Sequence, residues 1–171
     1  MVGRAGGVGG PRRSQPRGVA GGAGARGDSL RQPLAVGAEG GGSIFASTVP
    51  GTFDTKKARI SVPAVFRTVL ARFDSNELMA RKSSHSPCID LWPKQAFEEE
   101  VQRRVASLDP FAPDYEKQVR RLVANVHPLQ PDAEGRVVLP RELIEKAGLD
   151  GEIVFSGRIK FFQIWNAARW R

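Results

Sequence analysis

The chain has 171 residues, 40% of them apolar and 26% charged, and its formal net charge is +8. This length allows one compact domain or two small ones, with enough apolar residues for a core. No apolar run reaches the roughly 18 residues of a membrane-spanning helix, no apolar segment typical of a secretory signal occurs near the start, and the single cysteine, Cys88, excludes an internal disulfide. We therefore expect a cytoplasmic protein with no membrane partner.

Residues 1–42 differ in composition from the rest of the chain. They contain 14 of the 19 glycines, no aromatic residue, and six arginines against two acidic residues. Such a segment cannot bury enough apolar surface to offset the entropy of ordering, so we predict a disordered Gly/Arg-rich extension. Two interpretations of it stay open. It is either an arginine-rich arm that binds nucleic acid or a non-functional artefact of an early start codon, with true translation beginning near Val36 or Ile44.

Beyond the extension, the sequence repeats itself. KKARISVPAVF (56–66) aligns with AEGRVVLPREL (133–143) at an offset of 77 residues, and CIDLWPKQAF (88–97) aligns with FQIWNAARW (162–170) at an offset of 73. Matches at two fixed offsets indicate an internal duplication, with a short insertion in the first copy. We predict a first copy at 49–96, a helical connector at 97–125 and a second copy at 126–169.

Both copies have the same predicted order of elements. A short strand runs into a polar turn, and a second strand, rich in β-branched residues, follows. A proline ends that second strand and opens a helix, and two more strands close the copy. The first copy has a turn at 55–58, a strand at 59–62, a helix at 64–73 and strands at 78–81 and 88–92. The second has a turn at 132–135, a strand at 136–139, a helix at 141–147 and strands at 153–156 and 161–165. Between the copies, helical spacing of apolar residues, broken at Asp109-Pro110, predicts a helical hairpin within 94–124.

The predicted fold is mixed α/β and mainly β. Half-units of about 45 residues bury their own apolar faces poorly. We therefore expect the two copies to interleave around a pseudo-twofold axis into a small β-barrel with flanking helices. Unpaired strand edges and the aromatic residues Trp165 and Trp170 would be available to bind other subunits.

The stretch Asp132-Ala-Glu-Gly-Arg136, followed by Val-Val-Leu-Pro140, resembles the Asp-x-x-x-Arg motif and strand of the MraZ family of bacterial transcriptional regulators. The tryptophan spacing and the helices between the copies are also similar to that family. The resemblance implies two tandem AbrB-like swapped-hairpin repeats (SpoVT-AbrB repeats) and ring-like homo-oligomers. It also implies a nucleoid-associated protein of the cytoplasm that binds repeated promoter sites upstream of the division and cell-wall gene cluster, including its own promoter.

The first copy departs from this motif. Thr55 stands where the motif has aspartate, Asp54 comes one residue earlier, and Ala58 replaces the turn glycine. If the turn needs a positive φ, alanine costs roughly 1 kcal/mol relative to glycine. We expect the first turn either to take a different shape or to slip by one residue, so that Asp54 reaches Arg59.

The first turn is the predicted main contact with double-stranded DNA. It carries Lys56, Lys57 and Arg59 with no acidic residue between them, which favours attraction to phosphates. Lys56 and Lys57 would hold phosphates, and Arg59 could donate to guanine O6 and N7. The alternative for Arg59 is an ion pair with Asp54 that fixes the turn.

The second turn is the predicted secondary site. Asp132 and Glu134 would repel DNA, so Arg136 is expected either to pair with Asp132 and fix the turn or to make a secondary DNA contact. Asp54, Asp132 and Gly135 are the predicted structural residues of the two turns.

The sequence offers little support for an enzyme. It contains no phosphate loop, dinucleotide fingerprint or metal-ligand cluster, and its two histidines and Cys88 have structural explanations. We expect no catalytic residue, metal or cofactor. Two other functions stay open: a protein-binding or antitoxin-like ring scaffold, because a fold does not fix a function, and nonspecific nucleic-acid binding through the Gly/Arg-rich extension.

Overall fold

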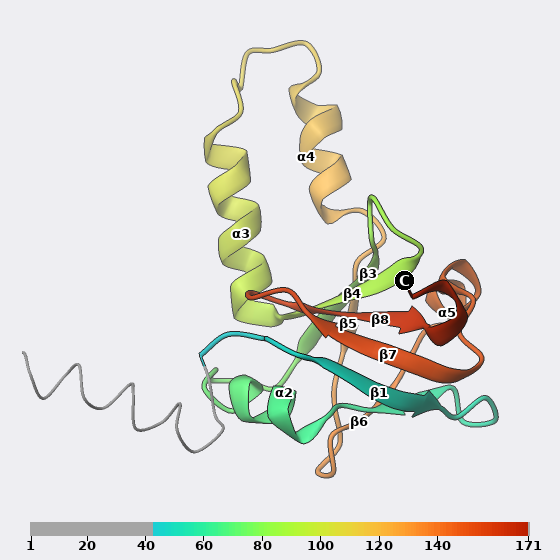
Figure 1. The fold of residues 1–171 in the computed structure, drawn as a ribbon. Coiled ribbons are helices and arrows are strands. Elements are labelled where there is room, and N and C mark those ends of the chain that lie inside the picture. Colours follow the sequence, from blue (N-terminus) through green and yellow to red (C-terminus); the bar gives the residue numbers. More distant parts are fainter. Residues whose placement is uncertain (1–42, 171) are drawn as a thin grey trace, which may run out of the picture. The chain divides into compact units, whose positions relative to one another are not determined.

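The computed structural model describes residues 43–170 (Figure 1); the extension predicted at 1–42 lies outside the described residues. The fold is mixed α/β with mostly sheet, as the sequence predicts. In chain order the elements are β1 (Thr48–Phe53), β2 (Arg59–Ser61), α2 (Ala64–Leu70), β3 (Leu78–Lys82), β4 (Cys88–Pro93), α3 (Lys94–Ala106), α4 (Tyr115–Val123), β5 (His127–Leu129), β6 (Arg136–Val138), α5 (Arg141–Ala147), β7 (Gly151–Gly157), β8 (Phe162–Asn166) and a short 3-10 helix (Ala167–Arg169).

Strands of both halves join in one antiparallel sheet, in which each half contributes one adjacent pair and one edge strand. Six strands follow the order β1-β7-β8-β4-β3-β5, and β2 pairs with β6 in a separate two-stranded ladder. The first strand of each half thus lies at an edge and pairs with the third strand of the other half. In the middle of the sheet, Asp90 of β4 faces Gln163 of β8, the residue that the repeat aligns with it.

The predicted closed barrel is not found among residues 43–170, because the strand order is open and the β2–β6 ladder is separate. Both ladder strands also end one residue earlier than predicted. The N–H groups of Val62 and Leu139 donate to the carbonyls of Gly135 and Ala58 in the turns of the opposite half, at 2.9 and 2.8 Å. These cross-connections hold each turn against the other half without extending the ladder.

Both edge strands of the sheet contain a proline, Pro50 in β1 and Pro128 in β5. Proline has no N–H to donate to a further strand, so natural sheets tolerate it mainly at edges. Along β1 the burial alternates between exposed and partly or fully buried residues, which is typical of a strand with one solvated face.

The core is built around four phenylalanines. Phe45, Phe66, Phe155 and Phe162 are each at most 1% exposed, and their ring centroids lie 4.9–6.5 Å apart. They come from the segment before β1, from α2, and from β7 and β8. Burial of one such side chain stabilises a fold by about 1.5–3 kcal/mol, so this cluster fixes α2 on the face of the sheet.

Helices α2 and α5 begin where the sequence predicts. Pro63 and Pro140 directly precede α2 and α5. The αL conformation of Gly148 (φ 64°) ends α5 at the predicted residue. By contrast, α2 ends at Leu70 rather than Phe73, because the next turn tightens into i→i−3 hydrogen bonds from Arg72 to Val69 and from Phe73 to Leu70. The helices α3 and α4 form the predicted hairpin, which projects from the sheet (Figure 1).

Candidate nucleic-acid interface

Two turns lead into the short ladder, and we name them loop 1 (54–59) and loop 2 (132–136). Because β2 and β6 are antiparallel, Arg59 pairs with Val138 and Arg136 pairs with Ser61. The two arginines that the sequence analysis singles out therefore lie at opposite ends of the ladder.

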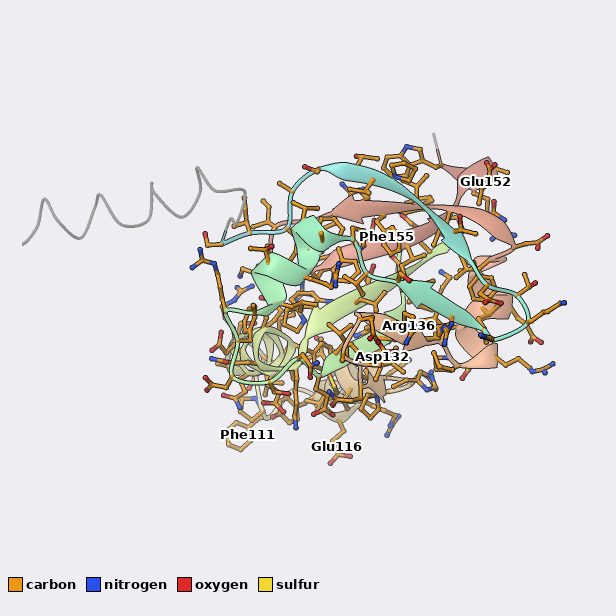
Figure 2. All side chains as sticks on the ribbon, turned by 90° about the horizontal axis from the view of Figure 1, so that it is seen from below. Phe111, Glu116, Asp132, Arg136, Glu152 and Phe155 are labelled. Atoms are coloured by element: carbon orange, nitrogen blue, oxygen red, sulfur yellow. The ribbon has the colours of Figure 1, made fainter. Side chains whose placement is uncertain are left out.

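Loop 2 is closed by its aspartate (Figure 2). Asp132 Oδ1 accepts hydrogen bonds from the backbone N–H groups of Glu134 and Arg136, at 2.9 and 2.8 Å. These bonds, led by that from the Arg136 N–H, hold the pKa of the Asp132 carboxyl below its usual value. The Arg136 side chain donates from Nε to Asp132 Oδ2 at 2.8 Å and from Nη2 to Glu134 Oε1 at 2.9 Å. Arg136 is thus neutralised by two carboxylates of its own loop.

A residue from the first half also holds loop 2. Arg67 of α2 donates from Nη1 to the carbonyl of Glu134 at 3.3 Å. Gly135 has a φ of 80°, and a Cβ at this position would meet the Cδ of Arg67. The glycine is therefore needed both for its left-handed backbone and for the close approach of Arg67. The sequence alone does not identify Arg67, since only the glycine itself indicates a close contact at this turn.

In loop 1 an aspartate again closes the turn, and the turn is one residue longer than in loop 2. The backbones of Asp54 and Arg59 pair with each other through hydrogen bonds of 2.9 and 3.2 Å. Asp54 Oδ1 accepts from the N–H groups of Lys57 and Lys56, each at 3.0 Å, and these bonds, the one from Lys57 first, lower the pKa of Asp54. Of the two shapes expected for this turn, the structure has the one-residue slip, in which Asp54 takes the place of Thr55.

Ala58 has a φ of 55° at the position that Gly135 occupies in loop 2. A non-glycine residue in this left-handed region is strained by about 1 kcal/mol or more. The first copy thus keeps the backbone conformation of the motif although it lacks the glycine.

The cations of loop 1 differ from Arg136 in their partners. Lys56 and Lys57 are exposed and Arg59 is half-buried. Within residues 43–170, the side chains of these three residues make no hydrogen bond or ion pair. Loop 1 therefore presents three positive charges, with only the Asp54 carboxylate beside them. Its charged groups are free to bind an anion, whereas those of loop 2 are already paired.

Comparison with known proteins decides the family. A family model described as "MraZ protein, putative antitoxin-like" matches residues 122–171. A protein of Gluconacetobacter diazotrophicus named Transcriptional regulator MraZ is 36% identical over 129 residues, 74% of this chain and 80% of that protein. One of the same name in Gluconobacter oxydans is 38% identical over 127 residues, 72% of this chain and 76% of that protein. The chain belongs to the MraZ family.

Membership of the MraZ family confirms the resemblance drawn from the Asp132–Arg136 motif. The matching range of the family model includes loop 2, while loop 1 lies outside it. Among residues 43–170 there is no group of three or more side chains suited to a metal ion. No helix in the same part of the chain is long and apolar enough to cross a membrane.

Cys88, for which the sequence favours a structural role, lies in β4 and is 0% exposed. Burial raises the pKa of its thiol to about 12. A reactive cysteine needs an accessible thiolate, so this position has the properties of a core residue.

Proposed function

We propose that the chain is a sequence-specific DNA-binding transcriptional regulator that contacts DNA mainly through loop 1. Its relatives carry the name Transcriptional regulator MraZ. The observation that carries the assignment to loop 1 is the set of unpaired cations Lys56, Lys57 and Arg59 on a turn whose backbone Asp54 fixes.

Each cation has a chemical role in this proposal. Exposed lysines neutralise phosphates and release counterions, so Lys56 and Lys57 provide affinity with little sequence preference. Arg59 has a planar guanidinium that can donate two hydrogen bonds to guanine O6 and N7, which gives a preference for one base pair. Loop 2 has a secondary role, because Asp132 and Glu134 neutralise Arg136 and repel phosphates.

We further propose that several subunits act together. A single subunit offers one small basic turn, which predicts weak binding that is sensitive to salt. A ring of subunits with tandem swapped-hairpin repeats would present loop 1 at regular spacing, and linked sites raise affinity by 10²-fold or more. Its targets would be spaced direct repeats upstream of the division and cell-wall gene cluster, including its own promoter, in the nucleoid.

The surface that we propose for subunit contacts is the α3–α4 hairpin rather than a sheet edge. Pro50 and Pro128 limit strand addition at the two edges. In α4, by contrast, no residue is fully buried, and its last residue, Val123, is 49% exposed. Phe111, between the two helices, is 93% exposed, and Figure 2 shows it away from the sheet.

The test is fluorescence anisotropy of the full chain on a duplex from directly upstream of its gene and on a scrambled duplex, across a salt series. Arg59→Gln and Arg136→Gln form a matched pair, because both arginines begin equivalent strands. We expect Arg59→Gln to weaken specific binding by about 1–3 kcal/mol, or roughly 5- to 150-fold, and Lys56→Gln to reduce the salt slope by about 1.

Arg136→Gln should change specific binding less than Arg59→Gln does. Equal binding of the two duplexes by the parent chain would contradict sequence-specific recognition. A larger loss with Arg136→Gln than with Arg59→Gln would contradict the assignment to loop 1 and favour loop 2.

A further inference from the structure

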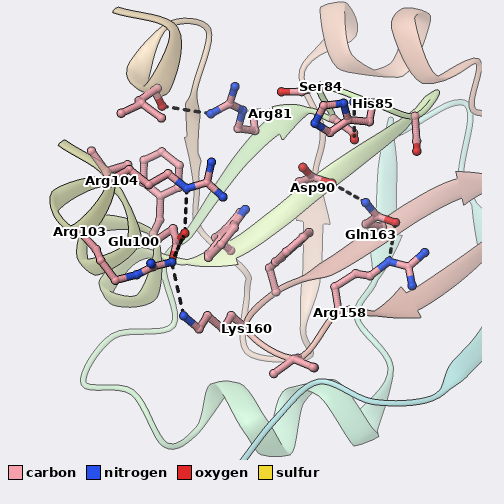
Figure 3. A pocket seen from close by; sticks show the side chains of 18 residues that line it. Arg81, Ser84, His85, Asp90, Glu100, Arg103, Arg104, Arg158, Lys160 and Gln163 are labelled. Carbon is pink, nitrogen blue, oxygen red and sulfur yellow. Dashed lines mark hydrogen bonds and ion pairs between the residues drawn. The ribbon is translucent and has the colours of Figure 1, made fainter. Parts of the chain in front are cut away.

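A cavity of about 540 Å³ lies between the α3–α4 hairpin and the sheet (Figure 3). Its lining comes from β3, β4, α3, α4, β8 and the turns that join β3 to β4 and β7 to β8. No residue of loop 1 or loop 2 lines it. Ligand sites of proteins typically have 300–1,000 Å³, so this cleft has the size of a small-molecule site and is separate from the proposed DNA contact.

One wall of the cleft is a carboxylate surrounded by cations. The Glu100 side chain is 9% exposed and lies 2.6 Å from Arg103, 2.8 Å from Arg104 and 3.4 Å from Lys160. Arg104 uses only its Nε in this contact. One negative charge thus faces three positive charges, and both Nη groups of Arg104 stay free of other bonds within residues 43–170.

The opposite wall combines a buried amide with a further arginine. Gln163 donates to Asp90 Oδ1 at 2.9 Å and accepts from Arg158 Nε at 3.1 Å. Since the partner of Arg158 is a neutral amide, its charge is not balanced by that bond, and its Nη groups make no further bond to described residues. Burial raises the pKa of Asp90, so the protein environment disfavours the negative charge there.

A fifth cation closes the cleft towards α4. Arg81 of β3 donates to the carbonyl oxygens of Leu122 and Arg121 at 3.0 and 3.3 Å, which are again neutral partners. The lining therefore contains five cationic side chains and two carboxylic acids. Clefts lined by an excess of one charge concentrate counter-ions of the other sign.

We propose that this cleft binds a small phosphate-bearing anion. Arginine guanidinium groups match the geometry of phosphate oxygens and form strong charge-assisted bonds with them. Arg104 on one wall and Arg158 on the other have free Nη donors for such a ligand, and Arg81 adds positive charge. The shared chemistry is the phosphate group, which either an inorganic polyphosphate or a nucleotide would supply.

The test is isothermal titration calorimetry of the full chain at low ionic strength, with pyrophosphate and ATP as separate probes. The cleft variants are Arg104→Gln and Arg158→Gln, both at solvent-accessible positions. Lys117→Gln, on an exposed part of α4 outside the cleft, is the matched control for loss of one positive charge. Lys56→Gln controls for phosphate binding at loop 1. Residues 1–42 are present in every sample, so they do not distinguish the variants.

We expect at least one probe to bind, with affinity reduced tenfold or more in both cleft variants and unchanged in the two controls. Equal binding of the two probes would assign recognition to phosphate alone, and binding of ATP only would assign it to a nucleotide; both support the proposal. The indole of Trp92 lines the cleft, so ligand binding should change the tryptophan fluorescence of the parent chain. Trp92→Phe should remove that change.

Three results would overturn the proposal. In the first, neither probe binds. In the second, the cleft variants bind like the parent chain although thermal unfolding shows that they are folded. In the third, Lys56→Gln abolishes binding, which places the phosphate on loop 1. A change of oligomer mass in the cleft variants without any probe binding would identify the cleft as a contact between subunits instead. DNA binding is measured in separate assays, so a failure of the cleft to bind phosphate would not contradict the proposed DNA-binding function.

Discussion

Ala58 holds a conformation that suits glycine better. Its φ of 55° matches the left-handed backbone of Gly135 in loop 2, and the Cβ of an alanine is strained in this region. We expect Ala58→Gly to raise the free energy of unfolding by about 0.5–1 kcal/mol. Urea unfolding followed by circular dichroism measures this change.

The control for Ala58→Gly is Gly135→Ala. The added Cβ is strained by the positive φ of this position and meets the Cδ of Arg67, so we expect a loss of stability of at least about 1 kcal/mol. Opposite signs for the two substitutions are the predicted outcome. A stability loss in Ala58→Gly would show that loop 1 does not need a left-handed residue at this position.

The residues of the candidate site could be predicted only where their partners are close in sequence. The Asp132–Arg136 pair spans four residues within one motif, and its hydrogen bonds form within that turn. The contact of Arg67 with Glu134 joins residues 67 positions apart. No local pattern encodes it, because it depends on how α2 of one half packs on the turn of the other.

Among the elements, α3 is joined to the turn between β7 and β8 by the ion pairs of Glu100. The salt bridges of Glu100 with Arg103, Arg104 and Lys160 lower the pKa of its carboxyl from 4.5 to about 2. A depressed pKa contributes stability that is complete above pH 4.5 and is lost as the pH falls towards 2. Because the three cations are more than half exposed, we expect a contribution of about 1–2 kcal/mol, less than the full shift would give.

Glu100→Gln should therefore destabilise the chain by that amount at pH 7, and the difference from the parent should shrink between pH 4.5 and pH 2. Urea unfolding at a series of pH values tests this. Glu98→Gln is the matched control, since Glu98 is an exposed acid of the same helix and should change stability by less than about 0.5 kcal/mol. A pH-independent difference for Glu100→Gln would exclude the ion pairs as its cause.

Helices and strands with strong local sequence patterns were predicted well, whereas the pairing of the strands was not. The bounds of α5 follow from Pro140 before it and Gly148 after it, and both are visible in the sequence. The strand pairing between halves rests on contacts between residues far apart in the chain, such as Thr48 of β1 with Ser156 of β7. Alternating patterns give the buried face of a strand but do not identify its neighbour.

At the scale of the whole described unit, neither half contains a complete sheet. In the first half, β1 pairs only with β7 and β2 only with β6, both of which belong to the second half. We expect the fragment 43–125 to form no folded monomer, because these strands would leave backbone groups and apolar faces without partners. Circular dichroism with light scattering tests this, and a cooperatively folded monomer would contradict it. A folded dimer would not, since a second copy can supply the missing strands.

Loop 1 and the Gly/Arg-rich extension are alternative sources of DNA binding, and truncation of the chain distinguishes them. Residues 1–42 and the remainder of the chain each have a net charge of +4, so composition alone does not decide between them. Arginines that contact only phosphates raise binding to every sequence and steepen the salt dependence. We therefore expect the chain 43–171 to bind a scrambled duplex more weakly than the full chain does and with a smaller salt slope. Its preference for the upstream duplex should be retained or increased, since base contacts from Arg59 remain.

Anisotropy titrations of both chains on both duplexes measure the four affinities. If the truncation removes the preference itself, the extension, rather than loop 1, carries the recognition.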